Sequence, residues 1–172
     1  MLTHLSTQQK HMQKACNYHH HFDDHHNYNH NDHHHPQARR GALLSTLRAE
    51  QGADILQWLG STLPPASEVP LILTGDLNAP PSEPVLPLLT GSSVTPLRSS
   101  YATSDQDTSW TTWKIRDTGE EKHCLDYVLH SPRLETQRLL SMPEAGQLGP
   151  GRLPSLQFPS DHMSLMVDLN IL

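Results

Sequence analysis

The stretch VPLILTGDLN, residues 69–78, joins a short apolar run to a polar turn. Its aliphatic part, residues 69–73, predicts a buried strand that delivers Gly75 and Asp76 at its C-terminal end. Gly75 permits a close approach of the backbone to a ligand. The residue types suit phosphoester hydrolysis, because Asp76 can orient and deprotonate a water while the Asn78 amide donates to a phosphate oxygen. The alternative is a plain turn, since Gly, Asp and Asn all favour turns.

Two later segments carry matching chemistry. Residues 124–130 predict a strand that contains Asp126, whose natural partner is the N–H of a histidine ring. The segment PSDH, residues 159–162, precedes an alternating apolar run over residues 163–171 that predicts the last strand, with one face buried. His162 can supply a hydrogen bond or a proton to the charge that develops on phosphorus. The alternatives are an outward-facing aspartate and a surface histidine.

The remaining segments predict a helix and a second cationic element. Leucines and isoleucine recur in register over residues 39–60, which indicates a helix, and Ser82 can cap a short helix that ends at Leu89. Residues 111–116 read as a strand followed by a turn over residues 117–120, and residues 90–109 and 142–159 read as loops. Lys114 and Arg116 share one face of that strand, which suits a phosphate or else forms a solvated cationic stripe.

The amino-acid composition differs between the N-terminal segment and the rest of the chain. The first 35 residues hold 11 of the 14 histidines, and residues 16–38 form a low-complexity segment that we expect to be disordered. Such a segment could also bind zinc, nickel or copper ions loosely. Residues 39–172 read as a globular domain, and residues 1–15 as a short separate segment. The formal net charge of −6 disfavours a broad nucleic-acid surface but allows a small anionic substrate.

Other features of the sequence bear on its compartment. Cys16 and Cys124 form no spaced pair, so neither a disulfide framework nor a thiolate zinc site is indicated. No apolar run approaches the length of a membrane span, and no signal peptide is evident at the N-terminus. We therefore expect a cytoplasmic protein without a membrane partner, or a mitochondrial one if a leader precedes this sequence. The oligomeric state is not indicated.

Taken together, the motifs resemble the endonuclease/exonuclease/phosphatase superfamily. The similarity rests on TGDLNAPPS (residues 74–82), LDY (residues 125–127) and PSDH (residues 159–162), which stand in the family's order. Within the superfamily, residues 48–59, 111–116 and 149–155 look like the nocturnin family. The resemblance covers residues 40–172, about the C-terminal half of the catalytic domain. It implies an α/β fold, a four-layer sandwich of two facing sheets with outer helices, of which this chain holds a partial domain, mainly one sheet and its flanking helices.

The resemblance also implies roles for individual residues. Asp76 positions the attacking water, Asn78 contacts the scissile phosphate, and Asp126 orients His162, which contacts the same phosphate. Asp161 lies near a Mg²⁺ ion, and Lys114 and Arg116 help hold substrate phosphate. Residues 3–5, Thr-His-Leu, look like the remnant of a family strand whose histidine contacts phosphate, which makes His4 a substrate-binding candidate.

The same resemblance implies alternative substrates. A nocturnin-type enzyme removes the 2′-phosphate of NADP(H), and the rival activity is removal of poly(A) from an RNA 3′ end. The family's magnesium-binding glutamate precedes its Thr-His-Leu strand and is absent here, so we expect a partial protein with little turnover of its own. A non-catalytic fragment and a His-rich metal-binding protein are the remaining alternatives.

Overall fold

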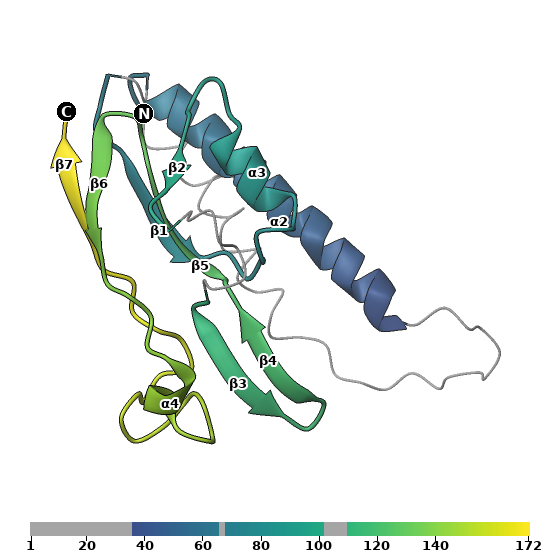
Figure 1. The fold of residues 1–172 in the computed structure, drawn as a ribbon. Helices are drawn as coiled ribbons and strands as arrows, with labels where there is room; N and C mark the ends of the chain where they lie inside the picture. Colours follow the sequence, from purple (N-terminus) through teal and green to yellow (C-terminus); the bar gives the residue numbers. More distant parts are fainter. Residues whose placement is uncertain (1–35, 66–67, 102–109) are drawn as a thin grey trace, which may run out of the picture. The chain divides into compact units, whose positions relative to one another are not determined.

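The computed structural model describes residues 36–65, 68–101 and 110–172. The segments predicted at residues 1–15 and at 16–35 lie outside this part of the chain. Figure 1 shows the helices and strands of the described residues. In chain order they are α2 (Pro36–Thr62), β1 (Ile72–Asp76), α3 (Val85–Thr90), β2 (Arg98–Ser99), β3 (Thr112–Arg116), β4 (Gly119–His123), β5 (Asp126–His130), β6 (Leu134–Leu139), α4 (Ala145–Leu148) and β7 (Val167–Ile171).

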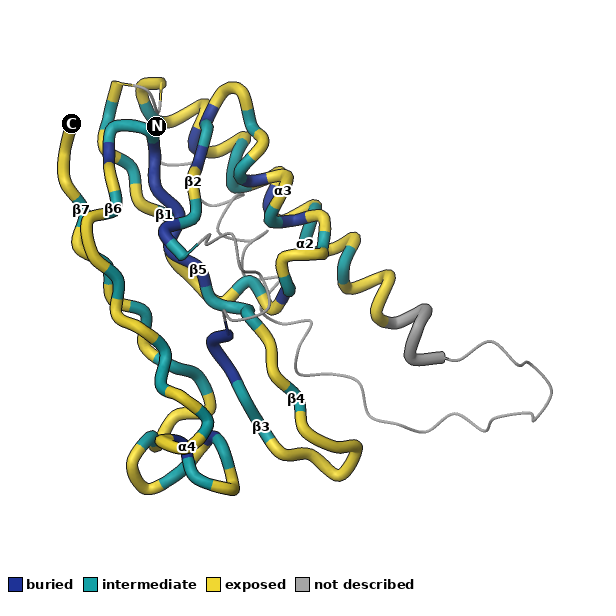
Figure 2. The backbone as a smooth tube through the Cα atoms, in the orientation of Figure 1, coloured by how far each residue is buried: buried dark blue, intermediate teal, exposed yellow. Residues whose placement is uncertain are grey.

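Helix α2 confirms the predicted helix and extends it by a few residues at each end. Only the C-terminal half of its apolar stripe is covered: Leu59 is 4% exposed, whereas Leu43 is 61% exposed. Helix α3 packs closely against the middle of α2, where a Cβ added to Gly52 would lie 3.0 Å from Val85 Cγ2. In Figure 2 the described N-terminal residues of α2 are mostly coloured as exposed, and buried residues occur only in the C-terminal half of the helix.

Strand β1 lies in a three-stranded antiparallel sheet with the order β1-β5-β2. It begins at Ile72 rather than at Val69, because Ser131 binds the residues before it. The Leu71 N–H donates to Ser131 Oγ, and the same hydroxyl donates to the Val69 carbonyl. Val69 and Leu71 of the apolar run therefore bond to the Ser131 side chain, and strand pairing starts at Ile72 and continues through Asp76.

The two faces of this sheet differ in chemistry. One face packs on the helices and forms the main hydrophobic core, whose buried members are Ala79, Val85, Leu89, Leu97, Tyr127 and Leu129. Side chains alternate along a strand, so the other face carries residues 72, 74 and 76 of β1 and residues 126, 128 and 130 of β5. This second face ends at Asp76 and Asp126.

Two further antiparallel pairs complete the described part of the chain, β3 with β4 and β6 with β7. The predicted turn over residues 117–120 is too long, since the chain reverses at residues 117–118 and Gly119 already starts β4. Gly119 has a φ of 127°, which glycine tolerates. Strand β6 was not predicted, and β2 interrupts the predicted loop over residues 90–109.

Three predicted boundaries are wrong for identifiable reasons. Helix α3 starts after Pro84 with no side-chain cap, so Ser82 does not cap it. Strand β7 starts at Val167 rather than at Met163, because the Met163 N–H donates to the Thr111 carbonyl instead of joining β6. The predicted loop over residues 142–159 contains the short helix α4. Among the described helices, none is both long enough and apolar enough to cross a membrane.

Candidate active site

Two aspartates face each other at the end of the central strands. Asp76 is the last residue of β1 and Asp126 the first of β5, and they are direct cross-strand partners. Like charges in this position destabilise a sheet. Asp126 is partly buried, which raises the cost of its charge further. Such an arrangement of carboxylates is typical of a site that binds a cation.

His162 lies against Asp126. Its Nδ1 is 2.8 Å from Asp126 Oδ2, and both side chains are partly buried, with 26% and 18% exposed. A carboxylate only accepts hydrogen bonds, so Nδ1 carries the proton in this contact. In the neutral ring Nε2 is then an acceptor, and on protonation it becomes a donor. The structure thus brings together Asp126 and His162, which are 36 residues apart in the chain.

Asp76 and Asn78 form a turn of their own. Asp76 Oδ1 accepts the backbone N–H of Asn78 at 2.7 Å. Asn78 has a φ of 49°, a left-handed conformation that asparagine adopts more readily than most residues. Both side chains are exposed. The turn-forming and the chemical interpretations of this segment are therefore compatible, because the turn holds both side chains at the same end of β1.

The side chains of Asp76, Asp126 and His162 form one group, in which the possible ligand atoms lie within 4.8 Å of one another. Two carboxylates suit a hard divalent cation such as Mg²⁺, which is commonly bound through one or two carboxylates, waters and substrate phosphate. One oxygen of each carboxylate is used, by the Asn78 N–H and by His162. Within the described residues, the second oxygens have no hydrogen-bond partner, so the donor set fits a metal.

The other predicted residues are placed as follows. Lys114 Nζ is 2.6 Å from Asp161 Oδ2, and this hydrogen bond holds the pKa of Asp161 below its usual value. Asp161 does not belong to the group of three, as far as the described residues go, although it adjoins His162 in sequence. Arg116 lies at the tip of the β3–β4 hairpin, is about half exposed and lies 3.9 Å from Glu121. His4 lies outside the described residues.

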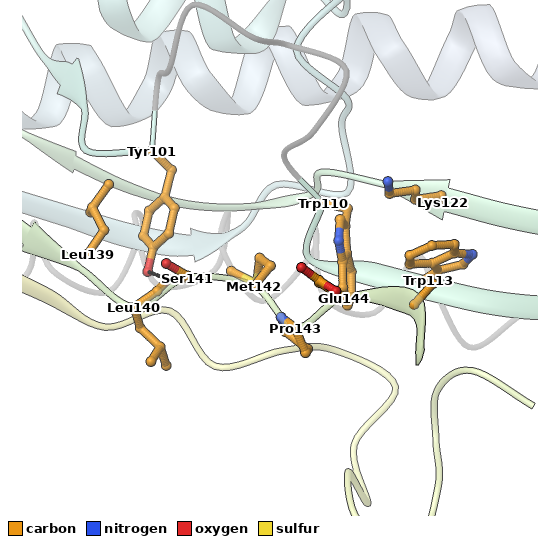
Figure 3. Close-up of a pocket in the computed structure, with 11 residues that line it drawn as sticks. Tyr101, Trp110, Trp113, Lys122, Leu139, Leu140, Ser141, Met142, Pro143 and Glu144 are labelled. Carbon is orange, nitrogen blue, oxygen red and sulfur yellow. Dashed lines mark hydrogen bonds between the residues drawn. The ribbon is translucent and has the colours of Figure 1, made fainter. Parts of the chain in front are cut away.

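A separate open pocket of about 490 Å³ lies beside the β3–β4 hairpin. Figure 3 shows Tyr101 at one end of it and Trp110 and Trp113 at the other. The two indole rings meet edge to face at 5.3 Å, and Lys122 Nζ lies 4.5 Å from the Trp113 ring centre. None of the residues of the aspartate–histidine group lines this pocket.

Sequence reasoning missed the contacts that hold the group together. Thr111 and Thr112 begin the strand predicted over residues 111–116, yet both are almost fully buried and contact the segments that carry Asp126 and His162. No local signal identifies them, because a Thr-Thr pair in a strand is ordinary. The partners of their hydroxyls lie 14 to 49 residues away.

Comparisons with known proteins point to one family. The profile of the endonuclease/exonuclease/phosphatase family matches residues 16–162. The chain is 38% identical to nocturnin of Drosophila melanogaster over 159 residues, which is 79% of this chain and 24% of that protein. It is 44% identical to nocturnin of Xenopus laevis over 72% of this chain and 32% of that protein.

A solved structure extends the comparison to the fold. The endonuclease/exonuclease/phosphatase from Bacteroides vulgatus superposes with a TM-score of 0.53 at 15% identity, over 74% of this chain and 45% of that one. This chain therefore spans less than half of that structure and a quarter to a third of the two nocturnins. The motifs, the profile match and the fold lead to one conclusion. The chain belongs to the endonuclease/exonuclease/phosphatase family.

Proposed function

We propose that this protein is a magnesium-dependent phosphoester hydrolase of the nocturnin type that removes the 2′-phosphate of NADP(H). The observation that carries the proposal is the convergence of Asp76, Asp126 and His162 within 4.8 Å. The identity to two nocturnins over more than two thirds of this chain supports the choice of family branch. The acidic net charge favours a small nucleotide over a long RNA.

Each residue of the group has a distinct role in the proposed reaction. Asp76 orients the attacking water and accepts its proton, and the Asn78 amide donates to a phosphate oxygen. Asp126 holds His162 with Nδ1 protonated, so that Nε2 points its lone pair or proton at the phosphate. The second carboxylate oxygens of Asp76 and Asp126, which accept no hydrogen bond within the described residues, would hold Mg²⁺, with Asp161 nearby. When bound, the ion neutralises charge that develops on the phosphoryl oxygens.

Cations beside the group complete the proposed substrate site. Lys114 is tied to Asp161 next to His162, and it can exchange this carboxylate for a substrate phosphate. Arg116 and His4 are the further candidates for binding phosphate. The Asp161 side chain is 52% exposed, so water can replace Lys114 as its partner when the lysine turns to a substrate phosphate.

The test is release of inorganic phosphate from NADPH by the purified chain, with Mg²⁺ or with EDTA. We expect slow release that requires Mg²⁺. Asp76→Asn and His162→Ala should each lower the rate about 1,000-fold, or to the blank. Asp168→Asn is the matched control, because Asp168 is an exposed aspartate on β7 that pairs with Arg138 away from the group. It should leave the rate unchanged.

Other outcomes would replace the proposal. Equal rates in Mg²⁺ and EDTA, or full activity in both site variants, would contradict it. Shortening of oligoadenylate without release of phosphate from NADPH would identify a deadenylase instead. Binding of NADPH without turnover would identify a non-catalytic module. Tight zinc or nickel binding that is lost on deletion of residues 16–35, without any hydrolysis, would identify a metal-binding protein.

A further inference from the structure

The side chain of Thr111 lies at the base of the aspartate–histidine group. Its Oγ1 accepts the backbone N–H of Leu125 at 2.9 Å and that of Asp126 at 3.1 Å. Thr111 is 3% exposed. A hydroxyl oxygen has two lone pairs, and both are used on successive amides of one segment. The position of the Asp126 backbone therefore depends directly on this hydroxyl.

The backbone of Thr111 and its neighbour bind the segment that carries His162. The Thr111 carbonyl accepts the N–H of Met163 at 2.8 Å, and the Thr112 hydroxyl donates to the carbonyl of Asp161 at 2.8 Å. These two bonds lie on either side of His162. Thr112 is 2% exposed and Asp161 is exposed, so this contact is partly buried.

We propose that Thr111 is a positioning residue that sets the geometry between Asp126 and His162, with Thr112 as its accessory. Thr111 holds the Asp126 backbone with its side chain and the His162 segment with its carbonyl. One residue thus joins two segments 36 residues apart that must meet within hydrogen-bond distance. This inference rests on the proposed function, because it assigns Thr111 to the same site.

The proposal predicts a specific kinetic pattern. Thr111→Val keeps the shape of the side chain but leaves two partly buried amides without this acceptor, so the start of β5 should move. A displacement of about 1 Å in a catalytic pair lowers the rate about 100-fold. Because Thr111 does not touch the substrate in this proposal, kcat should fall while KM stays within about twofold. Thr111→Ser keeps the acceptor oxygen, so its kcat should equal that of the unmodified chain.

The experiment compares Thr111→Val, Thr111→Ser and the control Thr90→Val in the full chain. Thr90 is a half-buried threonine on α3 whose hydroxyl donates to Leu86 O, away from the site. The readouts are kcat and KM for NADPH, and the NMR signal of the His162 Nδ1 proton, which a hydrogen bond to a carboxylate shifts far downfield. We expect only Thr111→Val to lose both kcat and this signal.

The two readouts separate this inference from the proposed function. If the unmodified chain releases no phosphate, the proposed function fails, and the NMR signal still tests the positioning role. A normal kcat and signal in Thr111→Val, or equal damage in Thr111→Ser, would overturn the inference, because the hydroxyl oxygen would then not matter. Should Thr111→Val fail to fold, Thr111→Ala is measured in its place with the same expected loss. Thr112→Val, which removes only the bond to the Asp161 carbonyl, tests the accessory residue, and an unchanged kcat and signal there would overturn the role of Thr112.

Discussion

The two faces of the β1–β5 pair differ in chemistry: one is apolar, and the other ends in two aspartates. The face toward α2 and α3 carries Tyr127 and Leu129, at 4% and 1% exposure, within the main core. The opposite face ends with Asp76 and Asp126 side by side. Alternation along the same strands places one set of residues in the core and the other set on a face that ends at the two aspartates, where Val128 and His130 are also buried. Packing on the first face stabilises the sheet, whereas the opposed charges of Asp76 and Asp126 on the second face destabilise it.

This difference indicates where selection for function acts. Opposed aspartates are unfavourable for folding, so their presence at one strand end needs a compensating role. The helix-covered face provides the rigid support that holds them. Substitutions of the core-facing residues should therefore change stability, whereas substitutions of Asp76 or Asp126 should change catalysis at little cost in stability.

The largest expected effect on the supporting face is that of Leu129→Ala. Leu129 is 1% exposed in the centre of the core, so its truncation should lower the free energy of unfolding by about 3 kcal/mol. Urea denaturation followed by circular dichroism measures this. The matched control is Ile72→Ala on β1, since Ile72 faces the other side and is 51% exposed. Equal losses in the two variants would show that the two faces do not differ in packing.

A smaller effect is expected for Tyr127→Phe, which links the two faces. Burial raises the pKa of Tyr127, so the phenol stays protonated, and it donates to the carbonyl of Ala79 at 2.7 Å. Loss of this bond should cost about 1 kcal/mol of unfolding free energy and free the turn next to Asn78. The midpoint temperature of thermal unfolding and the rate of phosphate release from NADPH should both fall. A drop in stability with an unchanged rate would confine Tyr127 to the core.

The smallest expected effect belongs to Leu47→Lys on α2. Leu47 lies on the predicted apolar stripe but is 42% exposed, and leucine and lysine have similar helix propensities. The change in unfolding free energy should stay within about 0.5 kcal/mol. Leu59→Lys, at the buried end of the same stripe, should unfold the chain. If Leu47→Lys is as damaging, the N-terminal half of α2 packs against something, and the comparison between the helix halves fails.

Periodicity identified the long helix and the strands around residues 72–76 and 126–130, because their apolar patterns are strong and local. It failed at β4 and β6, where polar and charged residues dominate strands that are exposed on at least one face. It also misplaced the start of β7, where the Met163 N–H bonds to the Thr111 carbonyl. At β6 and β7, contacts with distant segments, rather than local propensity, decide how the backbone is paired.

Residue type, neighbours and order are enough to recognise the chemically important residues Asp76, Asn78, Asp126 and His162. The folded chain was needed to show that Asp76 and Asp126 are cross-strand partners, that His162 bonds to Asp126, and that Thr111 contacts both segments. The physical reason is that a side chain's chemistry is local, whereas strand register and hydrogen-bond partners arise from contacts between segments far apart in the chain.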